Sequence, residues 1–204
     1  MKTFRPGNTW RFEGTPKLKP RLIIVCAPSG AGKSTLCAKL VREFPEIIEN
    51  VSFTTRPRRG KEEDGVDYFF IDKPEFEEKK SRGFFVESAE VHGNLYGVSY
   101  AQIETAVNAG RAMILDIDVQ GAKTLTKKFP DALTIFVMPP SLDELRRRLE
   151  TRDNGKTNNF DLRLANAKTE IGQADFFRFK VVNDELERAY GEFKKIVENE
   201  LGTS

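Results

Sequence analysis

The stretch that most constrains this chain is residues 26–35, Cys-Ala-Pro-Ser-Gly-Ala-Gly-Lys-Ser-Thr. The apolar residues 22–25 that precede it predict a buried parallel strand, and Leu36, Leu40 and Val41 recur after it at helical spacing. A strand, a glycine-bearing turn, Lys-Ser and a helix form the arrangement in which backbone N–H groups and a helix N-terminus surround phosphate oxygens. The chain is therefore predicted to adopt an α/β fold with a phosphate-binding loop at its first strand-to-helix turn.

Residues 27–35, named the phosphate loop from here on, follow the general pattern G-x-x-x-x-G-K-[ST] with one departure. Ala27 stands where the pattern opens with glycine, whereas Gly30 and Gly32 remain. We expect a slightly restricted first turn and an intact site, in which Lys33 reaches the β- and γ-phosphates and Ser34 offers its hydroxyl to Mg²⁺. The alternative, a glycine-rich turn with an incidental lysine, is disfavoured by the flanking strand and helix.

Length and composition bound the class of protein. The chain has 204 residues, of which 39% are hydrophobic and 31% are charged, so it has room for one α/β core with an inserted subdomain. No apolar run approaches the ~20 residues that span a bilayer, and the first residues lack the apolar region of a secretory signal. Its two cysteines, Cys26 and Cys37, fall in a predicted strand end and helix, which suits a reducing compartment. We expect a cytoplasmic protein without a membrane partner.

The formal net charge of +2 hides a basic N-terminal segment. Residues 1–21 contain six lysines or arginines and a single glutamate. We interpret residues 1–20 as a basic, flexible arm and residues 21–202 as the folded domain. Nucleic-acid binding through this arm is an alternative, but few aromatic residues accompany the charges, so no nucleic-acid partner is expected.

Hydrophobic periodicity predicts alternating helices and strands along most of the chain. The predicted helices are 34–44, 74–82, 100–109, 120–129, 141–152, 161–174 and 186–201. The predicted strands outside the central segment are 22–25, 51–54, 112–117, 133–138 and 181–182. This alternation is typical of a doubly wound parallel sheet.

Residues 56–100 differ from the rest, because charge runs, aromatic pairs and glycines alternate there in a way that suits short antiparallel strands. We interpret them as part of a β-rich insertion. Ligands of doubly wound sheets bind beyond the carboxyl ends of the strands, where Lys33, Asp116 and Asp118 are expected to meet.

Arginines and tyrosines in the insertion predict a second anion site. Arg56 and Arg59 precede Tyr68, and guanidinium groups match phosphate geometry bidentately while a phenol adds a neutral donor. Two anion sites in one chain suggest that phosphate moves between two nucleotides. Taken alone, the residues favour a solvated hairpin in which nearby carboxylates, those of residues 62–64, balance the arginines.

Six segments, taken in order, resemble those of guanylate kinases. They are residues 27–35, 52–56, 65–70, 93–97, 115–121 and 182–184. The resemblance extends from about residue 21 to residue 200. It implies a P-loop, doubly wound parallel α/β sheet with core segments 21–51, 101–140 and 175–202, a β-rich GMP-binding insertion at 52–100 and a helical lid at 141–174.

The same resemblance implies an ATP:GMP phosphotransferase of purine metabolism that uses Mg²⁺ and acts as a monomer or weak homodimer. The implied ATP-binding residues are Ala27, Pro28, Ser29, Gly30, Ala31, Gly32, Lys33, Ser34 and Thr35. The implied GMP-binding residues are Ser52, Arg56, Arg59, Tyr68, Glu87, Tyr96 and Asp118. The implied catalytic residues are Lys33, Arg148, Arg152, Arg163 and Asp116, with Ser34 and a water-mediated Asp116 at the metal.

Base selection would rest on Glu87, whose carboxylate accepts hydrogen bonds from guanine N1–H and the 2-amino group, while Ser52 donates to O6. Adenine lacks both donors, so a buried carboxylate that faces it would go unpaired. The family usually offers a serine or threonine hydroxyl where this sequence has Val98. We therefore expect a weaker contact with guanine O6, unless Ser99 supplies the hydroxyl.

Two further classes remain open at this point. Guanylate-kinase-like domains of scaffolding proteins keep the fold and bind peptides, but they typically lack an intact phosphate loop. A P-loop kinase or ATPase with another substrate, such as a different nucleoside monophosphate, is disfavoured by Glu87 and the segment around Tyr68. Steady-state assays with ATP and different nucleoside monophosphates separate these classes.

Overall fold

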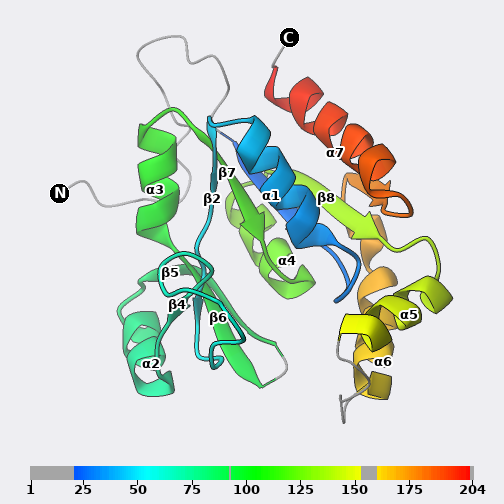
Figure 1. Cartoon of the computed structure of the whole chain (residues 1–204). Helices are drawn as coiled ribbons and strands as arrows, with labels where there is room; N and C mark the ends of the chain where they lie inside the picture. The colour runs from blue at the N-terminus through cyan, green and yellow to red at the C-terminus, as the bar shows by residue number, and fades with distance from the viewer. Residues whose placement is uncertain (1–20, 92, 153–159, 203–204) are drawn as a thin grey trace.

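The computed structural model describes residues 21–91, 93–152 and 160–202. The arm predicted at residues 1–20 lies outside these ranges. Within them the chain forms two sheets, a larger one at the centre of the molecule and a smaller one beside it, with a pair of helices at the opposite side (Figure 1).

The larger sheet is parallel, as the alternation of helices and strands predicted. Its strands, in spatial order, are β2 (Ile47–Glu49), β7 (Ala112–Asp116), β1 (Leu22–Cys26), β8 (Leu133–Met138) and β9 (Phe179–Val182). The central strand β1 is buried along its whole length. Burial on both faces explains why its sequence is a continuous apolar run and does not alternate.

Helices cover both faces of this sheet, which is the doubly wound arrangement. On one face α1 (Lys33–Glu43) and α7 (Leu186–Leu201) share a core cluster with Ile23 and Val25 of β1. On the other face α3 (Tyr100–Asn108) and α4 (Val119–Lys128) share a cluster with Ile24. Figure 1 shows α1 and α7 side by side in front of the sheet and α4 behind it.

The smaller sheet is built from strands between residues 53 and 99 and is mixed. Its spatial order is β4 (Phe69–Phe70), β3 (Phe53–Thr54), β6 (Asn94–Ser99) and β5 (Phe85–Val91), with β3 and β4 parallel and the other pairs antiparallel. Stacked aromatic rings pack on this sheet. Phe53 stacks on Phe69 at 4.6 Å between ring centroids, and Phe76 of α2 (Lys73–Ser81) stacks on Phe85 at 4.5 Å.

The remaining helices are α5 (Leu142–Arg152) and α6 (Phe160–Ile171), followed by the short 3₁₀ helix η1 (Ala174–Phe176). A separate apolar cluster that contains Leu145 and Leu149 of α5 and Ala167 of α6 holds the two helices together. This cluster is distinct from the two clusters of the central sheet, so α5 and α6 form a small packing unit of their own.

Two predicted elements differ most from those in the structure, while the bounds of several others shift by one or two residues. The strand expected at 51–54 is reduced to Phe53–Thr54 and belongs to the small sheet, whereas the parallel sheet ends on β2, which was not predicted. Three residues carry too little pattern to predict a strand, and β2 is stabilised by its pairing with β7. The helix expected to reach residue 174 ends at Ile171, just before Gly172.

Two properties bear on the class of protein. No helix within the described ranges combines the length and the apolar character that crossing a membrane requires. Cys26 and Cys37 are both free and completely buried, and burial raises the pKa of each thiol above its ordinary value.

Candidate active site

A cavity of about 830 Å³ opens where β1 and β7 end, and the phosphate loop and the small sheet both line it. Of the predicted ATP-binding residues, all but Ala31 contribute to its lining, and Ala31 is completely buried behind it. The cavity residues predicted for GMP are Ser52, Tyr68, Glu87, Tyr96 and Asp118. The topology thus brings together two sets of residues that the sequence places far apart.

The phosphate loop owes its shape to two glycines. Gly30 and Gly32 have φ angles of 90° and 87°, in the left-handed region that side-chain-bearing residues rarely adopt. An added Cβ at Gly32 would also lie 2.3 Å from Nδ2 of Asn183. That amide donates a 2.7 Å hydrogen bond to the carbonyl of Ala31, so the end of β9 holds the loop from behind. Asn183 lies in one of the six segments that resemble guanylate kinases, but its sequence context did not predict this role.

Lys33 and Ser34 converge on one carboxylate at the end of β7. Lys33 Nζ forms an ion pair with Oδ1 of Asp116 and donates a 3.2 Å hydrogen bond to the carbonyl of Ile117. Ser34 Oγ donates to Oδ2 of the same carboxylate at 3.0 Å. Burial is the largest single influence on the pKa of Lys33 and lowers it, but the charge and the hydrogen bond of Asp116, with contributions from Cys26 and Cys37, together raise that pKa above its ordinary value, so the ammonium stays charged.

The opposite part of the cavity carries Glu87, which is only 6% exposed. Burial, together with the nearby Asp118 charge, raises the pKa of Glu87 to about 7, and the Lys128 ammonium partly opposes this. Ser52 lies on the same lining, and its Oγ accepts a 2.9 Å hydrogen bond from Asn50. A buried acceptor and a hydroxyl therefore meet in one part of the cavity.

Val98 also lines this part of the cavity and is 1% exposed. Ser99, the alternative source of a hydroxyl, is the N-cap of α3, where its Oγ accepts a 3.3 Å hydrogen bond from the backbone N–H of Gln102. Its side chain is therefore engaged outside the cavity lining.

Arg56 and Arg59 do not line the cavity. Arg56 is buried, forms a bidentate ion pair with Glu62 at 2.8 and 3.0 Å, and lies over the Tyr68 ring at 5.2 Å from its centroid. The backbone N–H of Arg59 donates to the same Glu62 carboxylate at 2.7 Å. The pairing with Glu62 was anticipated by the hairpin interpretation, but that interpretation wrongly expected Arg56 to be solvated.

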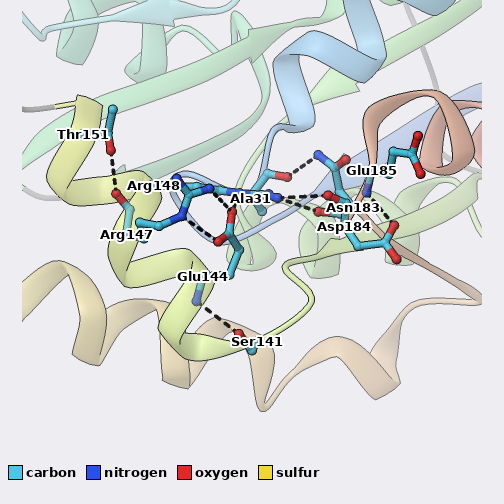
Figure 2. Close-up of polar contacts among 9 residues, drawn as sticks. All are labelled: Ala31, Ser141, Glu144, Arg147, Arg148, Thr151, Asn183, Asp184 and Glu185. Atoms are coloured by element: carbon cyan, nitrogen blue, oxygen red, sulfur yellow. Dashed lines mark hydrogen bonds and ion pairs between the residues drawn. The ribbon is translucent and has the colours of Figure 1, made fainter.

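The predicted lid arginines differ in position. Arg148 of α5 lines the cavity, with its Nε donating to Glu144 at 2.8 Å and its Nη2 donating to the Asn183 carbonyl at 3.0 Å (Figure 2). Arg163 of α6 donates a 2.9 Å hydrogen bond to Ser29 Oγ in the phosphate loop. Arg152 is the last residue of α5, and its side chain lies outside the described part of the structure.

Several cavity residues were not predicted from the sequence, among them the acidic residue Glu170. Glu170 of α6 lines the cavity, and burial raises its pKa to about 7 even though the Lys33 charge acts in the opposite direction. It follows Arg163 by seven residues, a spacing that places both on the same helix face. That spacing was the only available signal, and it does not distinguish a cavity residue from a solvated one.

Oxygen atoms dominate the charged part of the site. Within the described residues no group of three or more His, Cys, Asp or Glu side chains could hold a metal ion by themselves. The Ser34 hydroxyl and the Asp116 carboxylate are nevertheless hard oxygen ligands at the phosphate loop. A cation here would need further ligands from phosphate oxygens or water.

Comparisons with known proteins agree on one family. The family model described as guanylate kinase matches residues 19–200. The guanylate kinase of Bdellovibrio bacteriovorus is 52% identical over 184 residues, 90% of this chain and 100% of that protein. The guanylate kinase of Myxococcus xanthus is 44% identical over 86% of this chain and 85% of its own length. The crystal structure of guanylate kinase from Anaplasma phagocytophilum superposes with a TM-score of 0.75 at 33% identity, covering 92% of this chain and 90% of that one.

Proposed function

Because the chain belongs to the guanylate kinase family and transfers the γ-phosphoryl group of ATP to GMP, giving ADP and GDP, we propose that its large cavity holds both nucleotides together. The observation that carries the proposal is the double lining: the phosphate loop forms one part of the cavity, and Glu87, Tyr68 and Tyr96 of the small sheet or its flanks form another. The γ-phosphate of ATP and the phosphate of GMP would then lie next to each other between these two parts of the cavity, shielded from solvent.

The chain then has three parts. The core is 21–51, 101–140 and 175–202, the GMP-binding insertion is 52–100, and the lid is 141–174. ATP phosphates bind the backbone N–H groups of residues 27–35, and Lys33 contacts the β- and γ-phosphates. GMP enters from the insertion, with its base toward Glu87.

In the insertion, GMP is recognised at both ends. The Glu87 carboxylate accepts from guanine N1–H and the 2-amino group, Ser52 donates to O6, and Asp118 contacts the nucleoside. The phosphate is bound by Arg56, Arg59, Tyr68 and Tyr96. Since Arg56 pairs with Glu62 beside the Tyr68 ring, the pair holds its guanidinium in place before GMP arrives.

The lid arginines act on the transferred group. Arg148, Arg152 and Arg163 stabilise the charge that develops on its equatorial oxygens, while Lys33 and Asp116 keep the attacking and leaving oxygens in line. Arg163 contacts Ser29 of the phosphate loop, which supports a lid that closes on this loop. Closure excludes water and so suppresses hydrolysis of ATP.

Mg²⁺ is part of the proposal. Ser34 Oγ would hold it directly and Asp116 through a bound water, because both offer hard oxygen ligands beside the phosphate loop. When bound, Mg²⁺ neutralises negative charge on the ATP phosphates. We further propose that the protein is cytoplasmic, in keeping with its two free cysteines, that it acts as a monomer or weak homodimer, and that it needs neither membrane nor nucleic acid.

A steady-state assay of ADP formation tests the residue roles. Wild-type protein with ATP and Mg²⁺ is compared on GMP, AMP, UMP and dTMP, and we expect activity only with GMP and none after chelation of the metal. Glu87→Gln should raise the KM for GMP roughly 10- to 100-fold, because one buried acceptor becomes a mispaired donor. Glu90→Gln, exposed on the same strand, is the matched control. An unchanged KM in Glu87→Gln would contradict the assignment of the base site.

A further inference from the structure

Gly121, in the first turn of α4, lies against the carboxylate of Glu87. An ideal Cβ added to Gly121 would be 3.0 Å from both Cδ and Oε1 of Glu87 and 3.1 Å from Oδ1 of Asp118. Such distances are shorter than ordinary van der Waals contacts, so a methyl group here would displace a neighbour by a few tenths of an ångström. The space that a side chain would fill is therefore occupied by two acidic groups of the cavity.

Backbone conformation does not explain this glycine. Gly121 is an ordinary residue of α4 and is absent from the glycines with positive φ, unlike Gly30 and Gly32. Glycine inside a helix lowers stability relative to alanine, because it loses more conformational freedom on folding. Glycine at residue 121 therefore makes α4 less stable than alanine would. What alanine would disturb is the pair of carboxylates, Glu87 and Asp118.

The two carboxylates differ in how firmly they are held. Asp118 is the N-cap of α4, and its Oδ1 accepts a 2.7 Å hydrogen bond from the backbone N–H of Gly121. Among the described residues, no hydrogen bond or ion pair ends on the Glu87 carboxylate. A methyl group at residue 121 would therefore move Glu87 more readily than Asp118.

We propose that Gly121 is a positioning residue that sets the depth of the Glu87 carboxylate in the cavity and so determines selectivity for the guanine base. The inference rests on the proposed role of Glu87 in base recognition. A carboxylate that accepts two parallel hydrogen bonds tolerates little displacement, and the 2-amino contact is lost when it tilts or moves aside. Gly121 acts through Glu87 and does not itself touch the nucleotide.

The test is Gly121→Ala, compared with Gly191→Ala in α7, where an added Cβ would meet nothing within 4 Å. We expect Gly121→Ala to raise the KM for GMP about tenfold while the KM for ATP stays within about twofold. Its preference for GMP over inosine monophosphate, which lacks the 2-amino group, should fall. Gly191→Ala should change none of these quantities. A merely structural role for Gly121 would not separate GMP from ATP or from inosine monophosphate.

A double-mutant cycle with Glu87→Asp makes the test specific to the contact. Aspartate withdraws the carboxylate by one methylene, so Glu87→Asp should cost less in the Gly121→Ala background than in the wild type. If Gly121→Ala lowers the melting temperature, adding Glu87→Asp should restore part of it, since the contact with residue 87 is then removed while the contact with Asp118 remains. Additive effects, or an unchanged KM for GMP in Gly121→Ala while Glu87→Asp is impaired, would overturn this inference alone. A wild-type KM in Glu87→Asp would overturn the base-site assignment itself.

Discussion

The phosphate loop and the insertion that we propose binds GMP face the same cavity but are built differently. Residues 27–35 are contiguous, and their shape comes from backbone conformation, with Gly30 and Gly32 in the left-handed region. The insertion contributes side chains from separate strands and turns, among them Glu87 and Tyr68, and it holds them with aromatic packing and ion pairs. A backbone site tolerates changes of side chain such as Ala27, whereas a side-chain site changes its selectivity with each substitution.

The largest expected effect lies on the side of the phosphate loop. Lys33→Ala should lower kcat about a thousandfold, because it removes the charge that we propose contacts the reacting phosphates, and it should leave the KM for GMP nearly unchanged. Lys39→Ala in the same helix removes an ion pair with Glu187 and a cation–π contact with the Tyr190 ring, neither of which involves a cavity residue, and serves as control. Single-turnover kinetics check the result. An equal loss in both variants would mean that α1 as a whole had been disturbed.

On the insertion side, Arg56→Lys should raise the KM for GMP about tenfold with little change in the KM for ATP. Lysine keeps the charge but cannot form the bidentate pair with Glu62 or lie flat over the Tyr68 ring. Arg58→Lys is the matched control, since Arg58 is exposed and its ion pair with Asp64 spans 3.8 Å. A larger change in the KM for ATP than in the KM for GMP would contradict the assignment of Arg56 to the GMP side of the cavity.

Acidification should also separate the two regions. The pKa of Glu87 is raised to about 7, so the carboxylate is mostly ionised at pH 8 and mostly protonated at pH 6. Guanine binding needs the ionised form, and the KM for GMP should therefore rise about tenfold from pH 8 to pH 6. Two charges act on Glu87: that of Asp118 raises its pKa and that of Lys128 lowers it. Glu87→Gln should flatten this profile; a profile that survives the substitution would point to Glu170, whose pKa is also about 7.

The smallest expected effect is at Val98. Val98→Thr adds a hydroxyl beside the base and should lower the KM for GMP by about two- to fivefold, the gain of one modest hydrogen bond. The same hydroxyl would be buried without a partner in the free enzyme, so the melting temperature should fall slightly. Titration calorimetry and thermal unfolding measure the two quantities. An unchanged or weaker affinity for GMP would show that valine costs the site nothing.

The same contrast explains which helices and strands could be predicted from the sequence. Strand 133–138 and helix 186–201 were predicted with the bounds that the structure has, because a buried strand and an amphipathic helix carry their own periodicity. Strand β2 was missed because its stability comes from pairing with β7, which leaves no trace in three residues. Local pattern thus predicts the core better than the edges.

The candidate site follows the same division. The phosphate loop was identified from ten consecutive residues, whereas Glu170 and the role of Asn183 depend on distant partners. Asn183 is fixed by its bond to the Ala31 carbonyl, and Glu170 reaches the cavity only because α6 packs beside α5. Neither relation can be deduced from spacing along the chain.

The reactivity of the two buried thiols, Cys26 and Cys37, can be used to measure how often the region around the phosphate loop opens. Cys26 ends the strand before the phosphate loop and Cys37 lies in the helix after it, and they are the two cysteines of the chain. Alkylating reagents attack thiolates, so modification must wait for the loop region to open transiently. A nucleotide at 100 times its Kd would oppose that opening by about 2.7 kcal/mol and slow alkylation about a hundredfold. The rate of alkylation, measured by mass spectrometry on the native sequence without any engineered probe, would then report how much of the protein has nucleotide bound.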